Sequence, residues 1–274
     1  MGVTCSSVEC AGDAKARNEA AALLLPLGFP FVAGEGAMGT TCSAVESAGA
    51  AKARLLLGST LGDLEQGSVT SLDLMGRGLQ DDGAALLARA VGSNRSLLAL
   101  DLRWNSIGAQ GAAALAAALV ANRSLTSLTL HCNSIGDEGA SKLGRALQAN
   151  TSLKALDLSW NSIGNSGACS LAEALVVNGS LESLQLERNC IKGQGAVALA
   201  KALGVNRSLV RLQLGQNPVE EQGALALAEA VIANGCSATV DIVEELQSSH
   251  RSSLLSLDPN TASPLSSART PPWD

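Results

Sequence analysis

Residues 155–168 read ALDLSWNSIGNSGA and repeat, almost unchanged, a stretch that lies 56 residues earlier, ALDLRWNSIGAQGA at 99–112. A third version, SLTLHCNSIGDEGA, occupies residues 127–140, midway between the two. Repetition at a fixed period is typical of stacked solenoids. Alignment of the chain at a step of 28 residues gives six units without insertion or deletion: 69–96, 97–124, 125–152, 153–180, 181–208 and 209–236.

Each unit follows the pattern LxxLxLxxNxIxxxGAxxLAxALxxNxS and combines two hydrophobic periods. Leu100 and Leu102 alternate at period 2, which predicts a short strand with one buried face. Ala112, Leu115 and Leu119 recur at helical spacing, which predicts a helix in the second half. Neither element buries its apolar face alone, so the units must stack, with parallel strands about 4.8 Å apart. Because helices are wider than this spacing, we predict an α/β solenoid shaped as a horseshoe, with strands on the concave face and helices on the convex face.

Two further columns of residues fit this geometry. A glycine near the strand-to-helix turn indicates either close approach of two segments or an unusual backbone angle. An asparagine just past the strand is expected to bond the backbone of neighbouring turns through its buried amide. The glycines are Gly83, Gly111, Gly139, Gly167, Gly195 and Gly223, and the asparagines are Asn105, Asn133, Asn161, Asn189 and Asn217.

Five N-x-S sequons also recur at the end of the units. In a secreted protein such sequons would accept glycans. We favour a structural interpretation, in which each asparagine marks the C-terminal turn of a helix and tolerates left-handed backbone angles there. The five are Asn94, Asn122, Asn150, Asn178 and Asn206.

The 28-residue unit resembles the ribonuclease-inhibitor class of leucine-rich repeats. Residues 133–164 are most similar in sequence to the C-terminal repeats of CARD-containing NOD-like receptors; they read NSIGDEGASKLGRALQANTSLKALDLSWNSIG. Residues 233–243, ANGCSATVDIV, resemble the strand that closes the array of those receptors. The resemblance implies a leucine-rich repeat solenoid but leaves the function open, because ribonuclease inhibitors, Ran GTPase-activating proteins and tropomodulin ends use related units. The sequence contains no GxxxxGK[ST] motif, so the nucleotide-binding module of NOD-like receptors is not expected here.

Charge and cysteine content argue against several function classes. Residues 69–236 hold 13 Lys and Arg against 13 Asp and Glu, which gives no basic field for nucleic-acid phosphates. The seven cysteines are scattered and form no CxxC pair, which is typical of reduced thiols and predicts a cytoplasmic protein. The most apolar run, residues 20–32, is too short to span a membrane, and acidic residues precede it, unlike in a signal peptide.

The concave face carries the candidate site. Leucines at the fourth and sixth positions of each unit point inward, so positions 3, 5, 7 and 8 largely face the hollow. Tryptophan and arginine are the residues that most often anchor protein interfaces. We therefore expect a protein partner to bind there, although the indoles could instead lie flat and merely cover the sheet edge. The expected partner-binding residues are Trp104, Trp160, Arg103, His131, Glu187, Arg188, Asp101 and Asp157.

Catalysis, metal binding and cofactor binding are not expected. His131 and Cys132 are adjacent in the sequence, but adjacent strand residues diverge and no second His or Cys pair converges on them. The favoured function is a non-catalytic scaffold or regulator, with signalling or innate-immune regulation implied only by the resemblance. One alternative is a GTPase-activating protein of the Ran-activator type, which would use Arg103 or Arg188.

The N-terminus suggests a second alternative, a membrane-tethered adaptor. Residues 1–17, MGVTCSSVECAGDAKAR, nearly repeat residues 38–54, MGTTCSAVESAGAAKAR. The start satisfies the N-myristoylation pattern at Gly2, and Cys5 is within reach of palmitoylation. An internal duplication in a disordered leader would explain the same residues. We divide the chain into a leader (1–42), a helical cap (43–68), the six repeats (69–236), a capping strand (237–246) and a disordered Ser/Pro-rich tail (247–274).

Overall fold

The computed structural model describes residues 48–234 and 239–241, in which helices and strands alternate along the chain. The predictions for Gly2, Cys5, the leader and the tail lie outside these residues. The described helices are α2 (Ala48–Gln66), α3 (Gln80–Ser93), α4 (Ala109–Ala121), α5 (Gly136–Ala149), α6 (Asn165–Val177), α7 (Gly193–Val205) and α8 (Glu220–Asn234). The described strands are β1 (Ser71–Asp73), β2 (Ala99–Asp101), β3 (Ser127–Thr129), β4 (Ala155–Asp157), β5 (Ser183–Gln185), β6 (Arg211–Gln213) and β7 (Thr239–Asp241).

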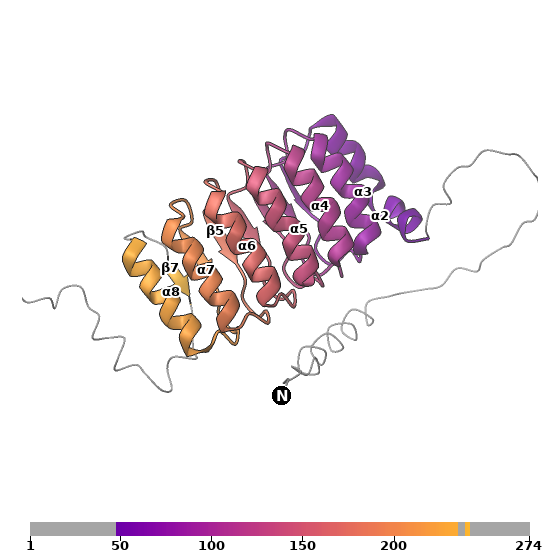
Figure 1. The fold of residues 1–274 in the computed structure, drawn as a ribbon. Helices are drawn as coiled ribbons and strands as arrows, with labels where there is room; N and C mark the ends of the chain where they lie inside the picture. Colours follow the sequence, from indigo (N-terminus) through magenta and orange to yellow (C-terminus); the bar gives the residue numbers. More distant parts are fainter. Residues whose placement is uncertain (1–47, 235–238, 242–274) are drawn as a thin grey trace, which may run out of the picture.

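The strands form one parallel sheet in the order of the sequence, β1 to β7. The register advances by one repeat at each step, so that Leu100 pairs with Leu72 on one side and Leu128 on the other. The helices form a single layer that covers one face of the sheet (Figure 1). This arrangement confirms the predicted α/β solenoid, an open stack of strand–helix units.

The core lies between the sheet and the helix layer. Leu100 and Leu102, on the predicted strand, and Leu115 and Leu119, on the predicted helix, are all at most 2% exposed. The same positions are buried along the stack and form one continuous hydrophobic cluster. Each unit therefore completes its core only against its neighbours, as expected of a repeat protein.

The glycine column reflects close packing between successive repeats. Gly167 has no positive φ, but a Cβ atom built there would lie 3.0 Å from the Cβ of Ala140 and 2.7 Å from the Cγ2 of Ile163. Of the two explanations that the sequence allowed, close approach therefore applies. The Gly-Ala pair at the start of each helix lets it pack directly against the helix of the preceding repeat.

The asparagines that follow the strands form a buried hydrogen-bonded ladder, as predicted. Asn189 donates from Nδ2 to the carbonyl oxygens of Leu158 and Leu186, both at 3.0 Å. Its Oδ1 accepts from the backbone N–H groups of Asn161 and Ile163, also at 3.0 Å. Each of these amides therefore satisfies backbone groups of its own repeat and of the preceding one.

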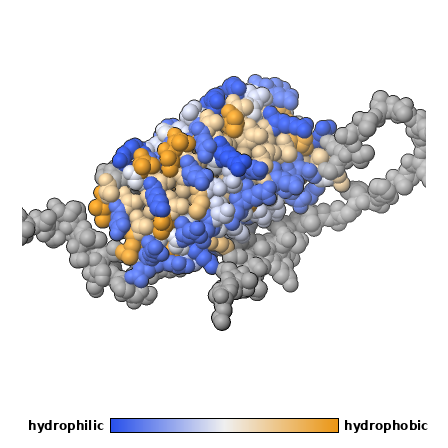
Figure 2. All heavy atoms as spheres, in the orientation of Figure 1, coloured by the Kyte–Doolittle hydropathy of each residue, from blue (hydrophilic) through white to orange (hydrophobic). Residues whose placement is uncertain are grey.

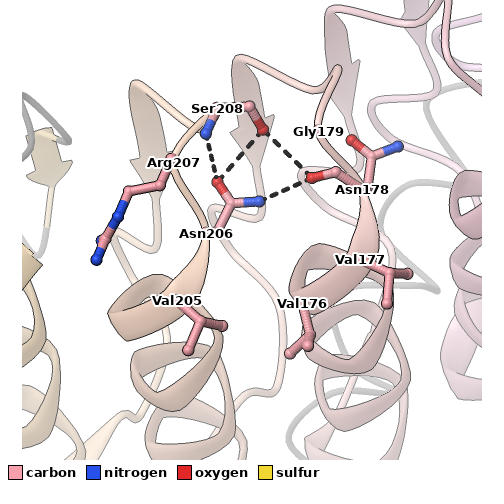
Figure 3. Close-up of a pocket in the computed structure, with 8 residues that line it drawn as sticks. All are labelled: Val176, Val177, Asn178, Gly179, Val205, Asn206, Arg207 and Ser208. Carbon is pink, nitrogen blue, oxygen red and sulfur yellow. Dashed lines mark hydrogen bonds between the residues drawn. The ribbon is translucent and has the colours of Figure 1, made fainter.

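The sequon asparagines form a second ladder, at the C-terminal ends of the helices. Asn206 Nδ2 donates to the carbonyl oxygens of Leu175 and Asn178, at 2.7 and 2.9 Å, and its Oδ1 accepts from the N–H of Ser208 (Figure 3). The expected left-handed angles are wrong, because Asn206 has φ −69° and ψ 138°, in the extended region. Burial and these inter-repeat bonds, rather than backbone tolerance, explain why asparagine recurs here.

Some helices are capped by the preceding repeat. Asp137, in the first turn of α5, accepts from the N–H groups of Gly164 and Gly167 at the start of α6, at 2.6 and 2.9 Å. Asn165 does the same for Lys192 and Gly195 at the start of α7. These side chains satisfy N–H groups that a helix leaves unpaired at its N-terminus. They therefore couple the end of one helix to its neighbour.

The two ends of the described stack carry a helix and a strand. Helix α2 packs beside α3, and three of its residues, Ala53, Leu57 and Leu64, are buried. Strand β7 pairs with β6 at the other end. Within residues 48–234 and 239–241, no helix is long and apolar enough to cross a bilayer.

Candidate functional site

The exposed face of the sheet contains a hollow of about 440 Å³ over the middle repeats. It lies over strands β2 to β5 and the residues that follow them. The lining is polar and includes five of the eight residues that the sequence proposed for partner binding. It consists of Asp101, Arg103, Thr129, His131, Asp157, Ser159, Gln185 and Glu187.

A row of aromatic rings runs along the C-terminal ends of the strands. The His131 ring lies between the two indoles, with centroids 6.4 Å from Trp104 and 6.5 Å from Trp160, tilted by 57° and 56°. The Cζ of Arg188 lies 4.4 Å from the centroid of the Trp160 ring, in cation–π geometry. Trp104 is 45% exposed and Trp160 is half-buried, so both indoles lie at the surface. This aromatic row consists of Trp104, His131, Trp160 and Arg188.

The backbone at the eighth position of each repeat is left-handed. Gly76 occupies this position in the first repeat with φ 67°, whereas Trp104, Trp160 and Arg188 adopt 59°, 60° and 51°. Bulky side chains are rarely found at such angles, and glycine adopts them without strain. Three of the four residues of the aromatic row, Trp104, Trp160 and Arg188, are therefore displayed from left-handed backbone. This left-handed angle could not be predicted from the residue types, because only the first repeat has a glycine at this position.

Asp101 and Arg103 form an ion pair at one end of the hollow. Arg103 Nη2 lies 2.6 Å from Asp101 Oδ2, and Arg103 Nε donates to both carboxylate oxygens. Burial raises the pKa of Asp101, but the hydrogen bonds and charge of Arg103 and the charge of His131 outweigh it, so the pKa falls below its usual value. The same pair raises the pKa of Arg103, mainly through the side-chain hydrogen bond to Asp101. The negative charge of Asp101 is therefore largely balanced within the pair.

The other two carboxylates of the hollow have weaker partners. His131 Nδ1 is 3.9 Å from Asp157 Oδ2, beyond hydrogen-bond distance, while Asp157 Oδ1 accepts from the N–H of Ser159. Glu187 Oε1 accepts from Gln213 Nε2 at 3.4 Å. Both carboxylates therefore keep capacity to accept further hydrogen bonds.

The structure brings all eight predicted residues to one face, in two groups. Five of them line the hollow, and Trp104, Trp160 and Arg188 join His131 in the aromatic row beside it. Cys132, which the repeat pattern also assigned to the concave face, is instead buried, at 8% exposure. The repeat pattern also put Thr129, Ser159 and Gln185 at positions that face the hollow, and they do line it, but they were not among the expected partner-binding residues because uncharged polar side chains there carry no distinctive binding signal. In the described part of the chain, no three His, Cys, Asp or Glu side chains gather as a metal site requires.

A second hollow, of about 420 Å³, opens on the edge of the stack at the C-terminal ends of α6 and α7. Figure 3 shows Val176, Val177 and Val205 around it, beside the second asparagine ladder, and all three valines are more than half exposed. The helix-covered face of Figure 2 carries polar side chains among apolar ones, with strongly apolar residues over the C-terminal repeats.

Comparison with known proteins shows what the repeats are similar to. Five segments match the leucine rich repeat family model, at residues 93–116, 121–144, 149–172, 177–200 and 205–228. No curated protein matches the chain significantly. Similar solved structures include actin-binding site 2 of leiomodin-1, with 18% identity over 65% of this chain and 89% of that chain and a TM-score of 0.46. Another is the tropomodulin C-terminal domain of Caenorhabditis elegans, with 14% identity over 65% of this chain and 93% of that chain and a TM-score of 0.44.

Proposed function

We propose that this chain, which is built of leucine-rich repeats, is a non-catalytic scaffold that binds a protein partner in its concave groove. The partner would contact the aromatic row of Trp104, His131, Trp160 and Arg188 and the hollow beside it. Leucine-rich repeats commonly present an extended curved surface for binding other macromolecules, because solenoid stacking leaves one face of the sheet uncovered. The proposal therefore depends on what this chain places on that face.

The observation that carries the proposal is the display of two indoles at the surface of the concave face, Trp104 exposed and Trp160 half-buried, both from left-handed backbone. Holding an L-residue at such angles costs roughly 1–2 kcal/mol relative to glycine. The contact of Arg188 with Trp160 returns only about 0.5–1 kcal/mol at an exposed site. Glycine at position 104 or 160, as at Gly76, would thus suit the fold at least as well. Cys132 and Gln216 hold the same angle in their own repeats, so we attribute to a partner not the angle but the choice of two large indoles at it.

The chemistry of the row also suits a protein partner. Tryptophan and arginine are the residues over-represented at interface hot spots. Tryptophan buries a large area with few freely rotating bonds, and the planar guanidinium group of arginine stacks on rings and donates several hydrogen bonds. The row lies near the middle of the stack, where contacts on either side can exclude water. Residues of the hollow would then provide the polar contacts that orient the partner.

The more specific identity of the repeats is part of the proposal. We assign them to the ribonuclease-inhibitor class, since each 28-residue unit contains a full convex helix, and we place the protein in signalling or innate-immune regulation by analogy with NOD-like receptors. The analogy concerns the repeats alone.

A quantitative pull-down tests the proposed groove. Full-length protein and a Trp104→Gly, Trp160→Gly double variant are used as baits in matched cell extracts, with captured proteins quantified by mass spectrometry. Glycine keeps the left-handed backbone and removes both rings. A Val177→Ser, Val205→Ser variant, changed on the far edge at residues 64% and 57% exposed, serves as the control. We expect the tryptophan variant to lose partners that the control retains; an unchanged partner set would refute the proposal.

A further inference from the structure

We infer that the polar hollow beside the aromatic row receives a basic side chain, arginine or lysine, from the protein partner. The inference rests on the proposed function, since it names the chemistry of the partner at that same face. It is carried by three features: the charge of the hollow, a buried hydroxyl in it that lacks a partner, and the aromatic row beside it.

The charge of the hollow is negative. Three carboxylates, Asp101, Asp157 and Glu187, line it together with one arginine, Arg103, which leaves a formal balance of −2 with His131 neutral. Arg103 is bound to Asp101, so the excess lies on Asp157 and Glu187. Among the described residues, neither of these carboxylates has a lysine or arginine within ion-pair distance. A cation from the partner would form ion pairs with Asp157 and Glu187.

The hydroxyl group of Ser159 points to the same ligand. Ser159 lines the hollow yet is only 2% exposed, and its Oγ has no hydrogen-bond partner among the described residues. Buried polar groups are nearly always hydrogen-bonded, and leaving one unpaired costs free energy. A guanidinium or ammonium group placed beside Asp157 would donate to this oxygen as well. Asp157, Glu187 and Ser159 thus offer acceptors but no charged donor, which matches a cationic group.

The aromatic row beside the hollow suits the stem of a long basic side chain. Arg188 already lies over the face of Trp160, so a guanidinium group is compatible with this row. Trp104 is 45% exposed and faces the tilted ring of His131. The aliphatic part of an arginine or lysine can pack on such rings while the charged end reaches the carboxylates. An acidic segment or a nucleic-acid phosphate would be repelled at the same place.

Defined peptides test the inference without an identified partner. Four capped peptides share one Gly/Ser/Leu sequence and differ only at the central residue, which is arginine, lysine, citrulline or glutamate. Binding is followed by the fluorescence of Trp104 and Trp160 in full-length protein carrying Trp273→Phe. We expect saturable binding of the arginine or lysine peptide at millimolar concentrations or below, at least about tenfold tighter than binding of the citrulline and glutamate peptides.

An Asp157→Asn, Glu187→Gln variant should bind the basic peptide about tenfold or more weakly, and the salt dependence of this binding should be abolished. The control, Glu173→Gln, Glu229→Gln, removes two exposed carboxylates from the convex helices and should leave binding unchanged. Circular dichroism confirms that each variant is folded. Equal binding of the citrulline peptide, retention of binding by the Asp157 and Glu187 variant, or no saturable response to either basic peptide would overturn the inference. If the tryptophan variant still loses its partners in that case, the groove remains the binding site and only its preference for a basic side chain is wrong.

Discussion

Replacing Asn189 with alanine should destabilise the protein by about 4 kcal/mol, although this residue lies in a loop. The variant removes the Oδ1 atom that accepts from the N–H groups of Asn161 and Ile163. Both N–H groups belong to buried residues and have no other acceptor among the described residues. An orphaned buried donor costs about 1–3 kcal/mol, so two of them cost about 2–6 kcal/mol.

The carbonyl oxygens that Asn189 contacts are less affected, because each has a second donor. Asn161 Nδ2 also reaches the oxygen of Leu158 at 3.1 Å, and Asn217 Nδ2 reaches that of Leu186 at 2.7 Å. The loss should therefore come mainly from the acceptor side of the amide. Because these oxygens have a second donor, one substitution weakens the ladder but leaves its other hydrogen bonds in place.

Urea unfolding followed by far-ultraviolet circular dichroism measures the loss. The matched control is Asn165→Ala, which also removes an acceptor of two N–H groups but at a half-buried helix terminus that water can reach. A cap of this kind is worth about 1 kcal/mol. Hydrogen exchange should accelerate most at the amides of Asn161 and Ile163. A loss for Asn189→Ala no larger than that of the control would refute the reasoning.

The remaining predictions concern packing, charge and the N-terminus. Gly167→Ala should lower the free energy of unfolding by roughly 1–3 kcal/mol, because its Cβ would collide with the preceding helix. The control is Gly179→Ala, which has open space around it and should change the free energy of unfolding by less than about 0.5 kcal/mol. Urea unfolding of both variants measures the difference. Arg103 holds the pKa of Asp101 below its unfolded value, so the stabilisation is present above the unfolded pKa and lost as pH falls through the folded one. Asp101→Asn should therefore be less stable than wild type at neutral pH, with the difference shrinking in acid; a constant difference across this range would contradict the assignment. If Gly2 is acylated, the intact mass of protein made in a eukaryotic host will include a myristoyl group that Gly2→Ala removes, and an unmodified or acetylated N-terminus would reject the tether.

The repeat architecture could be predicted from the sequence because its two hydrophobic periods switch within every unit. Leu100 and Leu128 keep the same place in each repeat, so the register of the sheet follows from the 28-residue step. The asparagine column of the loops was predictable for the same reason, since a buried amide recurring at one step has only the neighbouring backbone to bond. Local pattern and stacking agree throughout this part of the chain.

Features that depend on the neighbouring repeat could not be predicted. Asp137 looks like a first-turn residue of its own helix, yet it caps the next one, which only the stacking geometry shows. The left-handed angle at Trp160 leaves no mark in the sequence, because glycine stands at this position only at Gly76. The lack of a hydrogen-bond partner for Ser159 Oγ likewise depends on how this side chain is buried, which the sequence does not show.

Photo-cross-linking in cells tests the central claim, that the concave face binds a protein, most directly. Benzoylphenylalanine is introduced at Ser183, on strand β5 beside the hollow, or at Val177, on the far edge of the stack. The account predicts a discrete protein adduct from position 183 that disappears in the Trp104→Gly, Trp160→Gly background. Adducts from position 177 alone, or an adduct at 183 that persists without the two indoles, would contradict it.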